Sequence, residues 1–145
     1  ETISDRDHMR KILFFAIVVL FSLSCGKSGD AVPNVAVNFE RPLLDPSLSA
    51  LNVPGGAVLI NGYGVAGLIL YHEADNSYAA YDRCSSYMPQ NHCAVTLDAG
   101  NFTVTDPCSG SKFALFDGSP VKGPATKSLK MYNVNVSNYE IYVSN

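Results

Sequence analysis

TVTDPCSGSKFALFDGSPVKGPA, residues 103–125, is the stretch that decides the fold. A cysteine follows a proline, a Gly-Ser pair and an aromatic residue come next, and a turn-rich segment closes the stretch. This order is typical of a metal-binding loop between two strands. Asp106 and Ser109, however, stand where such a loop would be expected to offer its ligands. The stretch therefore indicates either a metal centre or a loop whose ligands have been replaced.

Short apolar runs separated by turn residues continue on both sides of this stretch. The runs NVAVNF, LKMYNVNV and YEIYV alternate, which is typical of half-buried strands, while GAVLI and AGLILY are continuous, as in strands covered on both faces. Eight prolines and eleven glycines punctuate the chain. The pattern predicts an all-β fold, an antiparallel β-sandwich or small barrel of nine or ten short strands. Residues 45–52 could hold one helical turn.

The first 34 residues do not read as part of this domain. Residues 1–8 fit neither a signal nor a domain and are interpreted as an upstream artefact. From Met9, two basic residues precede twelve nearly all apolar ones, residues 12–23, which is the length of a signal-peptide core and too short for a comfortable membrane span. We therefore divide the chain into a signal segment (9–25), a polar tether (26–34) and one β domain (35–145).

Cys25 ends the apolar stretch after small residues, which is the pattern of a bacterial lipoprotein signal. An ordinary secretory signal with an incidental cysteine is the alternative. The lipoprotein interpretation predicts an acylated Cys25 in contact with membrane lipid, and a protein held in the bacterial cell envelope, facing the periplasm or the exterior. A formal net charge of −3 with no basic cluster argues against a nucleic-acid partner.

Three cysteines remain in the domain, and in an exported protein a disulfide among them is the default expectation. Cys84 and Cys93 lie on one loop, and Cys108 lies on another. On these loops the chain resembles a Rieske domain. The second loop matches that family at its proline, cysteine, glycine, serine and phenylalanine, and the following Gly…Val…Gly-Pro-Ala is reproduced at residues 118–125.

The resemblance implies a Rieske-like fold over the domain and, for the family, a 2Fe-2S cluster held by two cysteines and two histidines. The positions of the four family ligands are occupied here by Cys84, Ser86, Asp106 and Ser109. Only one of the four is a family ligand type. Membrane-associated members join the two loops by a disulfide, which by position implies Cys93 with Cys108, with Cys84 as the alternative partner.

Other chemistry has weaker support in the sequence. Cys84, His92, Cys93 and Cys108 are chemically suitable for zinc, but adjacent His92 and Cys93 rarely chelate one ion together, and His92 is more simply an exposed loop residue. The glycine-rich residues 52–67 lack a Gly-Lys-Ser/Thr ending and predict a β-hairpin and not a phosphate loop. We identify no catalytic residue.

These observations favour a membrane-anchored Rieske-like lipoprotein with a degenerate cluster site, a non-enzymatic binding or structural module that meets an envelope protein. They also favour no cofactor and no metal ion, with a 2Fe-2S cluster as the alternative. An electron-transfer protein of the Rieske type is the first alternative function. A thiol-redox protein that uses a free Cys84, activated by the neighbouring Arg83, is the second.

Overall fold

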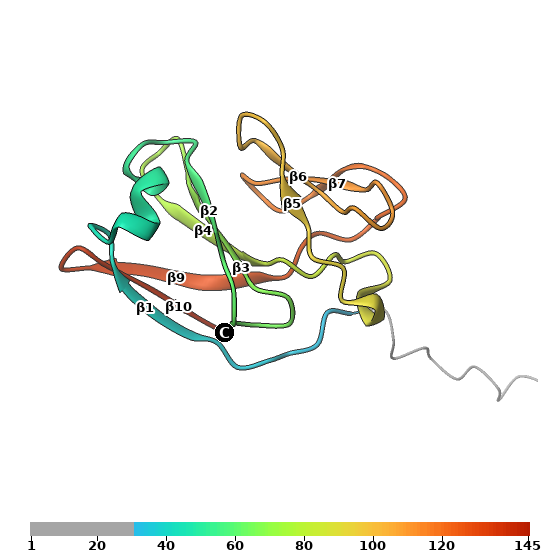
Figure 1. Cartoon of the computed structure of the whole chain (residues 1–145), viewed down its shortest axis with the longest axis horizontal. Helices are drawn as coiled ribbons and strands as arrows, with labels where there is room; N and C mark the ends of the chain where they lie inside the picture. Colours follow the sequence, from blue (N-terminus) through green and yellow to red (C-terminus); the bar gives the residue numbers. More distant parts are fainter. Residues whose placement is uncertain (1–30) are drawn as a thin grey trace, which may run out of the picture.

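The computed structural model describes residues 31–145, and ten strands in this range form two antiparallel sheets (Figure 1). The predicted all-β fold is confirmed. No helix of residues 31–145 is long and apolar enough to cross a membrane. The expectations for residues 1–8, for the signal segment and for acylation of Cys25 fall outside the described residues.

The larger sheet has six strands and joins the two ends of the domain. Its strand order is β1-β10-β9-β4-β3-β2. The strands are β1 (Asn38–Pro42), β2 (Ala57–Ile60), β3 (Leu68–His72), β4 (Tyr78–Asp82), β9 (Met131–Ser137) and β10 (Glu140–Ser144). Since β1 pairs with β10, the first and last strands close against each other.

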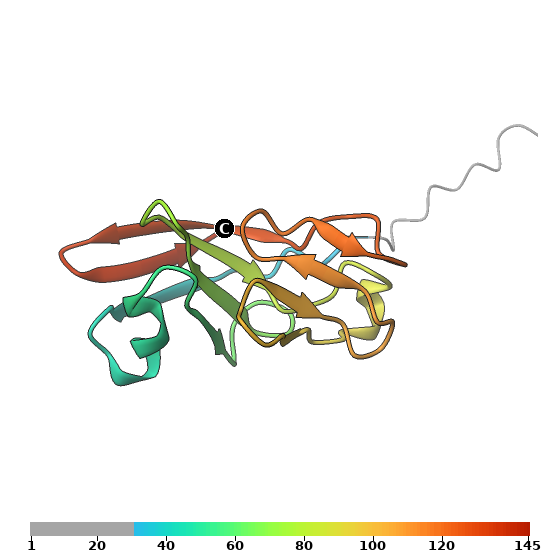
Figure 2. The same ribbon diagram turned by 90° about the horizontal axis from the view of Figure 1, so that it is seen from above.

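The smaller sheet is inserted in the chain between β4 and β9 and lies at one end of the larger sheet in both views (Figures 1 and 2). Its strands, in order, are β5 (Thr96–Leu97), β6 (Thr103–Thr105), β7 (Lys112–Ala114) and β8 (Pro120–Lys122). Two short 3-10 helices complete the domain, η1 (Pro46–Asn52) and η2 (Pro89–Asn91). The helical turn expected at residues 45–52 is therefore present as η1.

Strand β3 is buried on both faces, as its continuous apolar run predicts. Leu68 and Leu70 belong to one buried cluster, with β1, η1 and β10, while Ile69 and Tyr71 belong to a second cluster that includes residues of the smaller sheet. Side chains alternate across a strand, so one strand supplies both cores. This shared strand holds the two sheets in a fixed relation.

The start of the described chain packs on the domain. Lys130 Nζ donates to Pro33 O at 3.1 Å and to Asn34 Oδ1 at 2.7 Å, and the amide of Asn145 donates to Val35 O at 2.9 Å. Residues 33 and 34, which the sequence assigns to the tether, are therefore attached to the folded body.

Gly118 is the first residue of the Gly…Val…Gly-Pro-Ala motif at residues 118–125. Its φ is +74°, and a Cβ at this position would lie 2.8 Å from Cε1 of Tyr81. The Tyr81 hydroxyl donates to Leu115 O at 2.9 Å. Only glycine provides both the backbone conformation and the space that Tyr81 needs.

We therefore expect Gly118→Ala to lower the free energy of unfolding by about 2–4 kcal/mol, the sum of a left-handed conformation and a steric clash. Gly62→Ala is the matched control, because Gly62 also has a positive φ (+87°) but nothing within 4 Å of its added Cβ. Denaturant unfolding of both variants measures the difference. Equal losses would show that contact with Tyr81 contributes nothing.

Candidate functional site

Two loops carry the domain's cysteines. The first loop (residues 83–95) joins β4 to β5, and the second loop (residues 106–111) joins β6 to β7. The first loop is a hairpin at its base, where Ser85 N donates to Cys93 O and Val95 N donates to Arg83 O, both at 2.8 Å. Its tip contains η2, flanked by Met88 and His92 in the left-handed backbone region.

A disulfide between Cys93 and Cys108 joins the two loops, with Cα atoms 6.3 Å apart. This separation lies inside the usual range for a disulfide. Cys84 is the free cysteine of the described residues. The pairing is the one that the resemblance implies first, and the alternative with Cys84 is not formed.

The Asp106 carboxylate is the centre of a hydrogen-bond network beneath the disulfide. It is fully buried. Its Oδ2 accepts from Ser85 Oγ at 2.7 Å and from Ser109 Oγ at 2.6 Å, and its Oδ1 accepts from Cys108 N at 2.8 Å. Burial raises the pKa of this carboxyl, but the hydrogen bonds from Ser109, Ser85 and the backbone outweigh burial and hold the pKa below its usual value.

The network continues into a third segment. Ser109 Oγ has given its one hydrogen to Asp106, so at 2.8 Å it accepts from Ser111 Oγ, and Ser111 Oγ in turn accepts from Ala125 N at 2.9 Å. Ala125 follows the cis Gly123-Pro124 peptide. The two cysteine loops and the proline segment (residues 123–128) are therefore linked through buried polar contacts.

Ser86 takes no part in this network. Its hydroxyl donates to Lys127 O at 2.6 Å, so the side chain is directed to the proline segment. Ser85, which the sequence analysis did not select, contacts Asp106 instead. Neighbouring residues of an extended segment project in opposite directions, so Ser85 points toward Asp106 and Ser86 points away from it.

Cys84 is fully buried and its thiol contacts the carbonyl oxygens of Pro89, at 3.5 Å, and Ser85, at 3.7 Å. Burial, followed by the nearby charges of Asp82 and Asp106, raises the pKa of this thiol to about 11. Arg83 does not activate it, because the guanidinium donates to Asn61 Oδ1 at 2.8 Å and to Val95 O at 3.3 Å. These contacts do not support the hypothesis of thiol-redox chemistry at Cys84.

Asp82 is a second buried carboxylate that sequence reasoning missed. Its oxygens accept from Val65 N and the Tyr132 hydroxyl, each at 2.7 Å, from Cys84 N at 2.8 Å and from Ala66 N at 3.1 Å. It fixes the base of the first loop to the β2–β3 turn and to β9. An acid at the end of an otherwise apolar strand, YAAYD, is the signal that could have found it.

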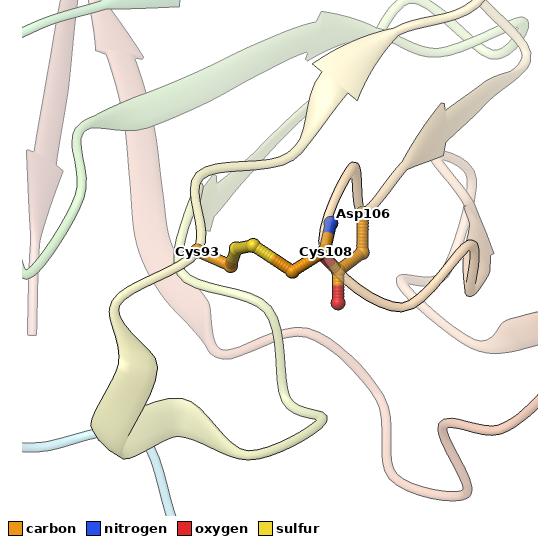
Figure 3. Close-up of side chains that lie close together, drawn as sticks. All are labelled: Cys93, Asp106 and Cys108. Atoms are coloured by element: carbon orange, nitrogen blue, oxygen red, sulfur yellow. A yellow bond between two sulfur atoms is a disulfide. The ribbon is translucent and has the colours of Figure 1, made fainter.

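The zinc set considered from sequence does not assemble. Within residues 31–145, the one group of at least three potential metal ligands has Cys93, Asp106 and Cys108, with ligand atoms all within 4.8 Å of one another (Figure 3). Neither Cys84 nor His92 belongs to it.

Comparison with known proteins identifies the class. No family model matches the chain. Over 94 residues the chain is 30% identical to the ferredoxin CarAc of Metapseudomonas resinovorans, a match that covers 63% of this chain and 82% of the ferredoxin. The chain therefore belongs to the family of Rieske-type ferredoxins.

Two solved structures are also similar. The plasma membrane Rieske protein PetC3 of Synechocystis PCC 6803 is 23% identical, with a TM-score of 0.52, and the match covers 76% of this chain and 98% of that protein. A structure described as a complex of reduced oxygenase and oxidized ferredoxin in carbazole 1,9a-dioxygenase matches at 27% identity and a TM-score of 0.45, over 63% of this chain and 82% of the matched chain. The first likeness supports the Rieske-like fold.

Family membership contradicts the expectation that this protein has no cofactor. The relatives are a ferredoxin and a Rieske protein, and proteins of the Rieske class carry a 2Fe-2S cluster. The four family ligand positions of this chain, however, do not fit that cluster. Three of them offer oxygen where the cluster takes a second thiolate and two imidazoles, and each side chain is engaged in the hydrogen bonds described above.

We expect the Cys84 thiol to react slowly with iodoacetamide in the native protein at pH 8, because a pKa of about 11 leaves about 0.1% of it as thiolate and burial blocks access. In denaturant the rate should rise at least tenfold. Peptide mass spectrometry over time, with the disulfide intact, follows labelling at Cys84 separately from Cys25. Fast labelling of the native chain would contradict the buried position.

Asp106→Asn should lower the free energy of unfolding by about 2–3 kcal/mol at pH 7, since three hydrogen bonds to a charged acceptor are weakened. A carboxyl with a lowered folded-state pKa stabilises the fold above its unfolded value of 3.8, and this contribution is lost as pH falls through the folded value. The difference between wild type and variant should therefore shrink below pH 4. Denaturant unfolding from pH 7 to pH 2 measures this difference in the free energy of unfolding, with the exposed Asp117→Asn as the control variant. A difference that stays constant over this pH range would contradict an ionised Asp106 in the folded state.

Proposed function

We propose that this protein works in electron transfer as a non-enzymatic member of the Rieske family, and that it meets its redox partner through the tip where the two cysteine loops converge. The observation that carries the proposal is the 30% identity with a ferredoxin over 94 residues. Ferredoxins are electron carriers and not enzymes. The disulfide and the buried network keep the two loops together at one end of the fold.

The surface beside this tip has the features of a docking site. A shallow groove of about 200 Å³ runs between the first loop and the proline segment and is lined by Ser86, Tyr87, Met88, Pro89, Pro124, Thr126 and Lys127. Met88 is 45% exposed, so an apolar side chain is presented to the solvent. Residues 118–139 contain three lysines and no acid. A partner surface with an apolar centre and carboxylates around it matches this chemistry.

The predicted lipid anchor would keep this groove near a membrane. A second groove, lined in part by Ala31, Val32 and Asn34, includes Ser86 and Lys127 of the first one, so the described chain starts beside the tip. Five residues lie between Cys25 and Ala31, a span of at most about 20 Å. We therefore propose an acylated Cys25 in the bacterial envelope and a redox partner at the same membrane surface.

Because the four family ligand positions do not fit a 2Fe-2S cluster, the proposal requires a centre on the purified chain that accepts and returns electrons through other ligands. The full chain, purified in mild detergent without oxygen, should contain iron and show visible absorption that changes reversibly with dithionite and a mild oxidant. Acid-labile sulfide near two per chain would identify a Rieske-type cluster, and iron without sulfide a different iron centre. An iron-free chain with no reversible couple would overturn the proposed function.

A further inference from the structure

We infer that reduction of the Cys93–Cys108 disulfide creates a binding site for one thiophilic divalent metal ion, held by the two cysteine sulfurs and the Asp106 carboxylate. Of these residues, only Asp106 occupies a family ligand position. The inference does not rest on the proposed electron-transfer function, because it concerns metal uptake by the reduced chain.

The geometry already brings the three ligand atoms together. Both sulfurs and a carboxylate oxygen lie within 4.8 Å of one another. Metal–ligand distances of about 2.3 Å for sulfur and about 2.0 Å for oxygen place the two sulfurs and the oxygen around a tetrahedral ion about 3.5–3.8 Å apart. Cys93 comes from the first loop, whereas Asp106 and Cys108 come from the second, so the ion would replace the disulfide as the link between the loops (Figure 3).

Asp106 is prepared to act as an anionic ligand. The hydrogen bonds from Ser85, Ser109 and Cys108 N fix the orientation of the carboxylate. Ligating carboxylates in metal sites are commonly held by hydrogen bonds of this kind. Oδ1 accepts from Cys108 N at 2.8 Å, and a carboxylate oxygen has a second lone pair with which it can bind an ion.

Solvent reaches the two disulfide cysteines but not Cys84. Cys108 is exposed and Cys93 is half-buried, whereas Cys84 has no exposed surface. A reductant and a metal ion can therefore approach Cys93 and Cys108 from the solvent. The same open side leaves a fourth coordination position for water, as in zinc sites with three protein ligands.

A phosphine or a dithiol can supply the two electrons that reduce the Cys93–Cys108 disulfide. A phosphine gives two electrons to the S–S bond and takes an oxygen atom from water to become a phosphine oxide, while the two protons of that water go to the cysteine sulfurs. A dithiol gives its two electrons and two protons and becomes a disulfide. On binding, the metal ion displaces both thiol protons to solvent, and two thiolates with one carboxylate leave a net charge of −1 around a divalent ion.

Cobalt(II) provides the test, because thiolate ligation gives intense near-ultraviolet absorption and tetrahedral geometry gives visible bands. The full chain, in mild detergent without oxygen at pH 7.5, is titrated with Co²⁺ before and after reduction by a phosphine. We expect one equivalent to bind after reduction and none before, and an equivalent of Zn²⁺ to abolish the bands. Bands of equal strength in the oxidised chain, or none in the reduced chain, would overturn the inference.

Variants assign the ligands. Cys84→Ala should bind cobalt as wild type does, and Cys93→Ser with Cys108→Ser should abolish binding. Asp106→Asn should weaken binding at least tenfold. If that variant does not fold, Cys108→Ser, at an exposed position, should reduce the near-ultraviolet band to half or less. Undiminished bands in the double variant, or their loss in Cys84→Ala, would refute the assignment.

The outcomes separate this inference from the proposed function. Iron and a reversible couple are measured on the chain as purified, and cobalt uptake is measured only after the disulfide has been reduced. Either result can fail while the other holds.

Discussion

The buried charge of Asp106 is the constraint on which the tip of the molecule depends. An ionised carboxylate with no exposed surface is tolerated only when hydrogen bonds replace its water. Here the donors come from both cysteine loops, Ser85 from the first and Ser109 with Cys108 N from the second. Folding of either loop alone would leave the carboxylate short of donors, so the two loops must form together. Satisfying one buried charge thereby fixes the relative position of two segments about 20 residues apart in the chain.

The disulfide joins the same two loops but stabilises the fold through the entropy of the unfolded chain. A cross-link between residues separated by 15 positions removes unfolded-state entropy worth about 3 kcal/mol. The carboxylate network contributes to the folded state, whereas the cross-link acts mainly on the unfolded state. Reduction of the disulfide should therefore lower stability without removing the contacts of Asp106, and the reduced chain would keep the arrangement that a metal ion needs.

The parts of the fold that the sequence predicted are those governed by periodicity and turn chemistry. The continuous apolar run at residues 68–72 predicted a strand buried on both faces, and β3 supplies both cores. Glycines separate the apolar runs, and Gly100, in the turn after Leu97, has a φ of +88°. Both features are local: alternation and positive φ are properties of a few consecutive residues.

The site was less predictable because it depends on side-chain direction across loops. The family resemblance selected Ser86, but in the structure Ser85 lies against Asp106 and Ser86 donates to Lys127 O. A shift of one residue in an extended segment reverses which side chain points inward, and spacing along the sequence does not reveal it. The burial of Cys84 was missed for the same reason, since an adjacent Arg83 suggested activation whereas Asp82 and Asp106 are the charges that reach the thiol.

These two carboxylates also explain where thiolate chemistry can occur at this tip. A thiolate at Cys84 would add a third buried negative charge beside Asp82 and Asp106, and the pKa of about 11 expresses that cost. Cys108 is exposed and Cys93 is half-buried, so water can solvate a charge that forms on either sulfur. A divalent cation between them would also offset the charge of Asp106, whereas near Cys84 it would need a path through the core. The same scaffold therefore makes Cys84 a core residue and leaves Cys93 and Cys108 as the cysteines that solvent, a reductant or a metal ion can reach.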